Sequence, residues 1–342
     1  MREADIDRSE HGFWRYADVL GLGDGARVRL GETVTPLVST EVLGRPCSVK
    51  LDYLLPTGSY KDRGAAFMLS SMLPLGLTEV VDDSSGNAGA ALAGYAAASR
   101  IGCTVFAPAG NTPGKLAQMR AYGARVVPVA GPRENAARAA RAAAEKTFYA
   151  SHNYLPVFLR GVATLGLELW EQNHFQLPEH VVVPCGHGSL VLGLHHAFEA
   201  LAHAQQGGRH PRIHAIQSDR YPAVERAWRS SDADVSAVGG GTTAAEGIAC
   251  REPLRGAAVL AAIRASGGSV CTVSEDEIVT GLRLLASAGM YSEPTSAAAA
   301  AGFRRLVAHG VIRPGESCVV VLTGSGLKTG SAVADLLHPV AR

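Results

Sequence analysis

The sequence predicts an α/β protein of two lobes, each a mostly parallel twisted sheet with helices on both faces. Short β-branched runs alternate with Ala-rich helical stretches, and several runs end in glycine or hydroxyl residues directly before a helix. The chain has 342 residues, of which 47% are hydrophobic and 18% are charged. This length and composition predict a soluble globular protein large enough for two lobes.

The expected elements follow a βαβα order. Strands are expected at residues 79–82, 103–108, 124–129, 180–184, 212–217 and 317–322. Helices are expected at residues 61–73, 88–100, 113–122, 133–146, 161–173, 189–204, 275–288 and 295–309. Two sheets separated near residue 150, the second larger than the first, best explain the number of strands.

Composition excludes several partners and compartments. With 32 Lys and Arg against 31 Asp and Glu, the net charge of +1 predicts no nucleic-acid partner. The N-terminal run MREADIDRSEHGFWRY lacks the apolar core of a signal peptide, and no later stretch is long and apolar enough to cross a bilayer, so we expect no membrane partner. The six cysteines form no CxxC pair and sit mostly in apolar runs, which predicts reduced thiols and a cytoplasmic protein.

Lys61, in the run PTGSYKDRG, is the first candidate for chemistry. Ser59 stands three residues before Asp62, a spacing that predicts a capping box and places Lys61 in the first turn of a helix. The positive end of the helix dipole and desolvation favour the neutral amine, which is the nucleophile that forms an imine with an aldehyde cofactor. For an isolated lysine, an exposed residue at a helix start is the better interpretation, so the neighbouring motifs decide.

The second motif is SSGNAG at 84–89, which follows an expected strand and leads into an Ala-rich helix. Backbone N–H groups at such a helix start can bind a carboxylate or phosphate. Gly86 and Gly89 allow a ligand to approach the backbone, and the Asn87 amide can donate to a phenolate oxygen. The structural alternative is a tight turn between strand and helix.

The third motif, VVVPCGHGSLVLG at 181–193, again combines a strand, a glycine loop and a helix. Gly186, His187, Gly188 and Ser189 could cradle a phosphate there. The rival interpretation is a nicotinamide oxidoreductase, but the glycines do not follow GxGxxG and no acidic residue ends the next strand about 20 residues on. A cofactor-phosphate cup is therefore preferred.

The fourth motif, VVVLTGSGLK at 319–328, places Thr323 at the carboxyl end of an apolar strand. A hydroxyl there can donate to an unprotonated pyridine nitrogen. Such a ring is a weaker electron sink than one paired with a carboxylate, which favours elimination or replacement over transamination. The alternative is a Thr-Gly turn that ends a strand.

PTGSYKDRG, SSGNAG, the GHGS loop and LTGSGLK resemble, in order and spacing, the fold-type II pyridoxal-phosphate enzymes of the tryptophan synthase β superfamily. Over residues 55 to 328 they are most similar to threonine synthase and its relatives. The resemblance implies pyridoxal 5'-phosphate between two lobes, with Lys61 as Schiff base and general base, Asn87 against the cofactor's 3-oxygen, and Thr323 against its ring nitrogen. It places Gly186, His187, Gly188 and Ser189 on the cofactor phosphate, and the substrate carboxylate on Ser84, Ser85, Gly86, Asn87 and Ala88.

The resemblance also implies domains, a reaction and an oligomeric state. We expect a small substrate-binding domain at residues 56–151, a large cofactor-binding domain at residues 1–55 plus 152–342, and a homodimer. The expected reaction is β- or γ-replacement or elimination on a small-molecule amino acid by a lyase or synthase of the carbon-oxygen lyase type. Deamination to a 2-oxo acid, as in serine and threonine dehydratases, is the alternative. A catalytically silent ligand-binding or regulatory relative is the alternative from another class.

Several segments depart from threonine synthases or stay open. Those enzymes carry an Asn-Pro-x-Arg stretch for the substrate phosphate, whereas HNYLPVFLRG puts Phe158 in the arginine position and displaces Arg160, which argues against the usual phosphohomoserine site. His187 either contacts substrate or packs beside the phosphate. SEPTSAAAAAG is similar to a Glu-Pro helix start of the family and is interpreted as structural. Cations that could form a different anion pocket, or be solvated, are Lys115, Arg120, Arg251 and Arg255.

Two further features are weak signals. His195 and Glu199 stand one helical turn apart with His203 further along, but no third ligand has convincing spacing, so we predict no bound metal and no structural zinc. The N-terminal arm with Trp14, Arg15 and Tyr16 could wrap over the other lobe or over a partner subunit, and the sequence does not decide between them.

Overall fold

The computed structural model describes residues 2–23, 25–109, 113–204 and 210–337. Its strands form a six-stranded sheet in the order β1-β2-β10-β7-β8-β9 and a four-stranded sheet in the order β5-β4-β3-β6. The first contains β1 (Leu37–Thr40), β2 (Cys47–Leu51), β7 (His180–Pro184), β8 (Arg212–Ser218), β9 (Ser269–Val273) and β10 (Cys318–Leu322). The second contains β3 (Glu79–Asp82), β4 (Gly102–Pro108), β5 (Arg125–Val129) and β6 (Phe148–Tyr149).

Pairing between strands is parallel throughout the four-stranded sheet, and in the six-stranded sheet all pairs except β1 with β2 are parallel. Alternate residues of β7 enter two different hydrophobic cores. Val181 and Val183 pack with residues of α5 (Pro156–Gln172) and α6 (Ser189–Ala204), while Val182 packs with residues of α9 (Glu275–Ser287) and α10 (Pro294–Ala308). The central strands β7, β8 and β10 are therefore buried on both faces, which explains their nearly continuous apolar runs, whereas the edge strand β1 is partly exposed. The predicted α/β fold class is confirmed.

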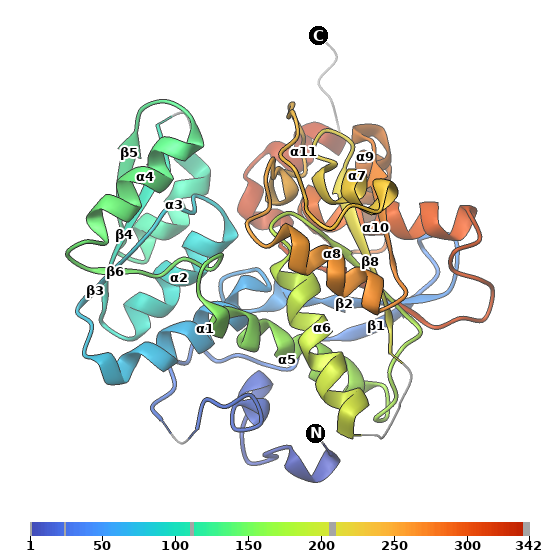
Figure 1. The fold of residues 1–342 in the computed structure, drawn as a ribbon, viewed down its shortest axis with the longest axis horizontal. Coiled ribbons are helices and arrows are strands. Elements are labelled where there is room, and N and C mark those ends of the chain that lie inside the picture. Colours follow the sequence, from blue (N-terminus) through green and yellow to red (C-terminus); the bar gives the residue numbers. More distant parts are fainter. Residues whose placement is uncertain (1, 24, 110–112, 205–209, 338–342) are drawn as a thin grey trace.

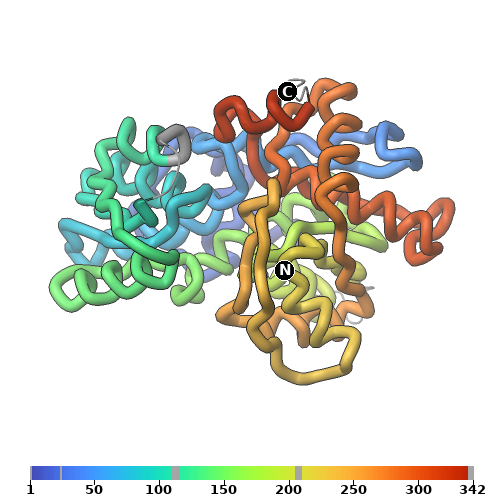
Figure 2. Tube along the Cα trace, turned by 90° about the horizontal axis from the view of Figure 1, so that it is seen from above, coloured from blue at the N-terminus to red at the C-terminus, as the bar shows by residue number. Residues whose placement is uncertain are grey.

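The remaining helices are distributed around the two sheets (Figures 1 and 2). Their bounds are α1 (Lys61–Met72), α2 (Asn87–Ala98), α3 (Pro113–Ala121), α4 (Arg133–Ala143), α7 (Ala223–Ser230), α8 (Gly256–Ala265) and α11 (Ala332–Leu337). In Figure 1, α2, α3 and α4 accompany the small sheet at the left, and α6 to α11 accompany the large sheet at the right. Helix α1 contacts both α2 and α5 between the two sheets. The proposed domain boundaries at 55/56 and 151/152 stay a prediction.

A buried group of charged side chains, called the ion cluster below, joins β2, α1 and α5. It consists of Lys50, Asp52, Arg63 and Glu168, all fully buried. Arg63 donates to Asp52 at 2.8 and 2.9 Å and to Glu168 at 2.8 Å, and Lys50 Nζ donates to Glu168 at 2.7 Å. Two positive and two negative charges balance, so the cluster can be buried without a net charge. It holds the start of α1 against the large sheet.

The N-terminal arm packs on its own chain. Trp14 stacks on Phe67 of α1 with ring centroids 5.3 Å apart, and its indole N–H donates to Glu32 at 2.7 Å. Arg15 and Tyr16 both bind Glu171 of α5. The arm therefore covers α1 and α5 of its own chain.

Candidate functional site

Lys61 is the first residue of α1, in the helix turn that the sequence predicts. Its Nζ lies 3.4 Å from the Ser189 hydroxyl, so the lysine motif and the start of α6 meet although 128 residues separate them. The same Nζ stands 4.8 Å from the ring centre of Tyr60 and 5.5 Å from that of Phe158. Two aromatic rings and a hydroxyl therefore surround the amine.

The predicted capping box at this helix is wrong. The N-cap residue is Tyr60, without a side-chain cap, and Asp62 accepts hydrogen bonds from the backbone N–H of Thr57 at 2.6 Å and from its hydroxyl. Burial raises the pKa of Asp62 to about 7. The Ser59 hydroxyl is buried and has no hydrogen-bond partner among the described residues. The Asp62 carboxylate therefore binds Thr57 in the preceding loop and does not take part in a cap at the start of α1.

Backbone hydrogen bonds join the lysine loop to the Thr323 motif. The N–H of Tyr60 donates to the Thr323 carbonyl at 2.9 Å, and the N–H of Ser325 donates to the Gly58 carbonyl at 3.0 Å. Thr323 is 1% exposed, and its hydroxyl lies 3.3 Å from that of Ser296. The structure therefore places Thr323 directly beside the lysine motif, at the carboxyl end of β10.

The SSGNAG segment forms the turn into α2, which begins at Asn87 after the N-cap Gly86. A Cβ on Gly89 would lie 1.9 Å from the Ser84 carbonyl oxygen, so only glycine fits there, whereas Gly86 is exposed and has open space around it. The helix has no side-chain cap. The first N–H groups of α2 can therefore bind an anion that approaches over Gly86.

Asn87 contacts a carboxylate that the sequence analysis took as structural. Its amide nitrogen lies 3.1 and 3.0 Å from the two carboxylate oxygens of Glu293, the N-cap residue of α10. Glu293 is buried, its N–H donates to the Gly324 carbonyl at 2.9 Å, and burial raises the pKa of its carboxyl. Sequence reasoning missed Glu293 as a site residue, because an acid before a Pro at a helix start has an ordinary structural explanation.

The GHGS loop runs from β7 into α6 and requires both of its glycines. Gly188 has φ +82°, and a Cβ on it would lie 2.1 Å from Val259. A Cβ on Gly186 would lie 2.9 Å from the Gly247 carbonyl oxygen. Ser189 is buried and begins α6. A glycine loop that opens a helix with a hydroxyl is a suitable cradle for a phosphate group.

A small cavity lies beside Ser189. Its lining residues are His152, Asn153, His187, Ser189, Leu254 and Arg255. Burial, with the charges of Arg133 and Lys61, lowers the pKa of His187 to about 4, and burial lowers the pKa of His152 well below its usual range. His187 Nδ1 lies 3.5 Å from the Cys250 sulfur, and His152 Nδ1 has no hydrogen-bond partner among the described residues. Both imidazoles are therefore neutral near pH 7.

The structure separates the candidate anion-binding residues. Arg255 lines the small cavity, whereas Arg251 is exposed and donates to the Val238 carbonyl at 3.4 Å. Arg120 is exposed on α3, and the side chain of Lys115 lies outside the described part of the chain. Arg160 is exposed too, with a guanidinium nitrogen 3.4 Å from the Cβ position of Gly21, and so points to the N-terminal arm.

Phe158, which the sequence analysis compared with an arginine of threonine synthases, packs beside the lysine. It is 1% exposed, and a Cβ on Gly64 would lie 2.5 Å from its ring. Its ring centre lies 5.6 Å from that of His152. An apolar ring, and not a cation that could bind a substrate phosphate, therefore lies beside Lys61 at this position.

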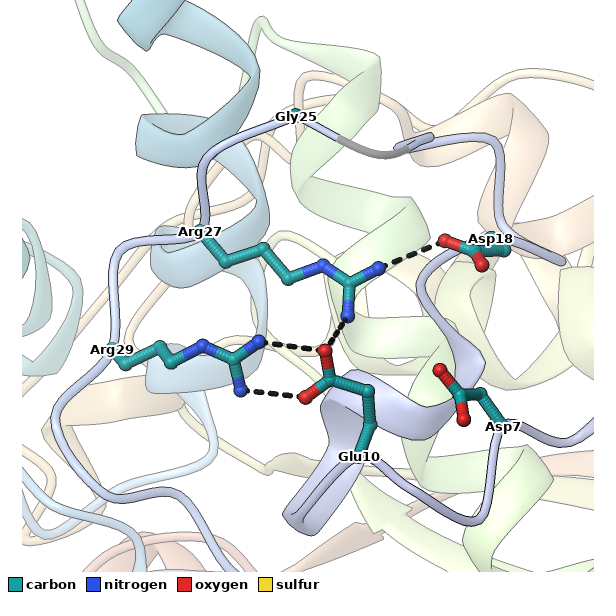
Figure 3. A pocket seen from close by; sticks show the side chains of 6 residues that line it. All are labelled: Asp7, Glu10, Asp18, Gly25, Arg27 and Arg29. Carbon is teal, nitrogen blue, oxygen red and sulfur yellow. Dashed lines mark hydrogen bonds and ion pairs between the residues drawn. The ribbon is translucent and has the colours of Figure 1, made fainter.

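A second cavity, of about 290 Å³, is lined by residues of the N-terminal segment alone and is a different kind of site (Figure 3). Glu10 pairs with Arg27 at 2.6 Å and with Arg29 at 2.8 Å, and Arg27 also pairs with Asp18 at 2.8 Å. Its two cations are thus neutralised by neighbouring acids. This cavity shares no residue with the cluster around Lys61.

The sequence matches a family model described as "Pyridoxal-phosphate dependent enzyme" over residues 28–324. Among curated proteins, the threonine synthase of Methanocaldococcus jannaschii is 33% identical over 341 residues, covering 97% of this chain and 84% of the relative. The threonine synthase of Methanosarcina acetivorans is 32% identical over 331 residues, covering 94% of this chain and 82% of the relative.

Solved structures resemble the chain over most of its length. A threonine deaminase from T.th. superposes with a TM-score of 0.72 at 27% identity, covering 85% of this chain and 92% of that one. The processed threonine deaminase isoform 2 of Solanum lycopersicum superposes with a TM-score of 0.78 at 20% identity, covering 97% and 91%. The second likeness concerns the fold alone. Among the described residues, no helix has the length and apolar character needed to span a membrane.

Proposed function

The chain belongs to the pyridoxal-phosphate dependent enzymes, is threonine synthase-like, and we propose that it replaces a group on Cβ or Cγ of an amino acid, with Lys61 holding the cofactor. The observation that carries this proposal is the convergence of four separate segments. The Lys61 amine contacts the Ser189 hydroxyl, and the backbone of the lysine loop is hydrogen-bonded to the Thr323 loop. Asn87 joins them through Glu293, which is bonded to Gly324.

The residues present suit pyridoxal 5'-phosphate. The Ser59 hydroxyl is buried beside the Thr323 loop with no partner among the described residues, and Gly86 at the start of α2 has open space around it. We assign the cofactor phosphate to Gly186, His187, Gly188 and Ser189, the ring nitrogen to Thr323, and the 3-oxygen to Asn87. When bound, the cofactor supplies an electron sink for negative charge at Cα.

Lys61 also has the surroundings of a proton carrier. The rings of Tyr60 and Phe158 flank its amine and limit the access of water. The Ser189 hydroxyl at 3.4 Å can orient the amine without adding a charge. We therefore assign to Lys61 the removal of the substrate α-proton as general base.

The substrate carboxylate is assigned to Ser84, Ser85, Gly86, Asn87 and Ala88. The first turn of α2 supplies free N–H groups there, and the exposed Gly86 leaves the approach open. The neutral histidines His152 and His187 and the half-buried Arg255 line the small cavity beside Ser189, which is too narrow for a water molecule, so we assign to them the side of the site toward which a polar or anionic leaving group departs. Phe158 argues against the usual phosphohomoserine site.

Deamination is the second candidate, because the T.th. threonine deaminase is 27% identical over 85% of this chain. The test is a panel of serine, threonine, phosphoserine and phosphohomoserine, each with and without an added nucleophile. Replacement predicts a new amino acid and little 2-oxo acid. Stoichiometric 2-oxo acid and ammonia without a nucleophile would overturn it in favour of deamination.

The role of Lys61 is tested separately by borohydride reduction of the cofactor-loaded protein and peptide mapping. The expected result is a modified Lys61 peptide and no colour in Lys61→Ala. An unmodified Lys61 would contradict the assignment, and a wild-type protein that stays colourless with added cofactor would favour a silent relative.

We extend the proposal to compartment and assembly. All six cysteines are free thiols, which supports a cytoplasmic protein. A homodimer is proposed from the family resemblance, and light scattering on the purified protein checks it, a monomeric mass being the contrary result.

A further inference from the structure

Three potential metal ligands meet on the far half of α6, away from Lys61. His195 and Glu199 lie one turn apart on this helix, and His210 precedes β8. One ligand atom from each of the three lies within 4.8 Å of the others. Sequence analysis found no third ligand, because His210 joins the pair only when the chain returns from α6 to β8.

His210 is oriented as a ligand would be. Its Nδ1 lies 3.4 Å from the Pro211 carbonyl oxygen, which can only accept, so the proton of the neutral ring belongs on Nδ1. Its Nε2 lies 3.0 Å from Oε1 of Glu199, a contact that is an ion pair when the imidazole is protonated. When the imidazole is neutral, two lone pairs face each other at this distance, and a cation between them would remove the repulsion. Phe198, packed edge-on at 6.0 Å, holds the ring in place.

His195 contributes the second imidazole. Its ring centre lies 5.7 Å from that of His210, and its Nδ1 is buried without a hydrogen-bond partner in the described part of the chain. Among the described residues, His195 Nδ1 has no hydrogen-bond partner and His210 Nε2 faces the Glu199 carboxylate, so both nitrogens can bind an ion together with that carboxylate.

We propose that His195, Glu199 and His210 bind one Zn²⁺ ion, with water completing a tetrahedral site. Two imidazoles and a carboxylate form a zinc donor set, and ligand atoms around one zinc ion lie roughly 3.3 Å apart. Here the His210 Nε2–Glu199 Oε1 distance is 3.0 Å, and all three ligand atoms lie within 4.8 Å of one another. The backbone carbonyl on His210 Nδ1 is the kind of partner that orients zinc-bound histidines. The Glu199 side chain is 49% exposed, so the ion can enter from solvent.

The ion would tie α6 to the start of β8. Since Ser189 at the other end of α6 contacts Lys61, the site lies on an element of the candidate active centre but outside its reacting groups. We therefore assign it a stabilising role: zinc binds the folded chain and raises its unfolding temperature.

The test is zinc binding to metal-stripped, cofactor-loaded protein, measured by calorimetry, together with the visible spectrum of the Co²⁺ form. Wild type is expected to bind one ion per chain and to give a tetrahedral Co²⁺ spectrum. His195→Gln, His210→Gln and Glu199→Gln are each expected to weaken binding at least about 10-fold, because even outer-shell partners have effects of this size. His203→Gln, an exposed histidine of the same helix, is the matched control.

Glu199→Gln keeps the test valid if a histidine variant fails to fold, since the Glu199 side chain is half exposed. The absorbance of the bound cofactor should be the same in all variants. No zinc binding by wild type, or equal binding by wild type and Glu199→Gln, would overturn the proposal. Equal losses in His203→Gln and His210→Gln would show nonspecific histidine binding and overturn it as well.

Discussion

Two groups of buried polar side chains lie on either side of α1 and differ in how they are paired. In the ion cluster, Arg63 and Lys50 bind Asp52 and Glu168 through several short hydrogen bonds. Around Lys61, in contrast, the Ser59 hydroxyl and His152 Nδ1 have no partner among the described residues, and the lysine makes one long contact. Fully paired charges stabilise a fold, whereas unpaired buried groups cost stability unless a ligand satisfies them. The side of α1 that carries Arg63 therefore stabilises the fold, and the side that carries Lys61 binds a ligand.

The largest expected effect is on activity, from Lys61→Ala. Removing the amine removes both the cofactor attachment and the general base, so we expect kcat/KM to fall by at least about 10⁴-fold, the upper end for a lost acid-base group. The free energy of unfolding without cofactor should change little, because the amine makes one long contact. Steady-state kinetics and denaturant unfolding measure the two. A variant that keeps a tenth of the activity would show that another group does this chemistry.

Arg63→Met, on the opposite side of α1, should lower the stability of the fold. The variant leaves Asp52 and Glu168 buried with one cation between them, and breaking such a cluster costs about 3–5 kcal/mol in the free energy of unfolding. Urea unfolding of the cofactor-free protein measures it. Arg8→Met, which removes an ion pair with Glu3 at the surface, is the control and should change nothing measurable. A similar small change in both variants would remove the distinction drawn here.

The ion cluster also shows which parts of the fold the sequence could predict. Strand β7 and helix α6 were predicted with correct bounds, because a continuous Val run is followed by glycines and an amphipathic stretch. Strand β2 was not predicted, since its Lys50 is neutralised by Glu168, 118 residues further along. Helix α5 begins at Pro156 and not at residue 161, because a Pro at the first helical position was taken as part of a loop.

Contacts between residues that lie far apart in the sequence also limit prediction of the site. The four motifs were local patterns of strand, glycine and helix, so sequence alone could single them out. Glu293 lies 206 residues from Asn87, and His210 joins His195 only through the return of the chain to β8. No local pattern records such partners, and β1, β6, β9, α7, α8 and α11, which are short or carry mixed polarity, were missed as well.

An intermediate effect is expected from Glu293→Gln, on the binding side. The change removes a charge-assisted contact of the Asn87 amide, and such contacts are worth about 1.5–3 kcal/mol, so kcat/KM should fall roughly 10- to 100-fold. The cofactor spectrum should shift too, since Asn87 is assigned to the 3-oxygen. Glu134→Gln, an exposed acid in the first turn of α4, is the matched control. Unchanged kinetics and spectrum in Glu293→Gln would mean that its carboxylate is structural after all.

The last expected effect is a difference in the pH dependence of the unfolding free energy between the two sides of α1. Burial would raise the pKa of Glu168, but Arg63 and Lys50 lower it to about 2, below its ordinary 4.5. The unfolded chain therefore binds the proton more tightly, and this stabilisation is present above pH 4.5 and lost as pH falls toward 2. Burial raises the pKa of Asp62 to about 7 from its ordinary 3.8, so the folded chain binds the proton more tightly.

For Asp62 the sign is thus reversed: its stabilisation is present below pH 3.8 and lost as pH rises through 7. Asp62→Asn, which keeps the shape but cannot ionise, should flatten the pH dependence of the unfolding free energy between about pH 4 and 7 and leave the acid limb unchanged. Urea unfolding at a series of pH values, with cofactor-free protein, measures both limbs. If Asp62→Asn and wild type gave parallel curves over this range, the buried carboxyl beside Lys61 would have to be charged in the folded state, and the contrast between the two sides of α1 would fail at this residue.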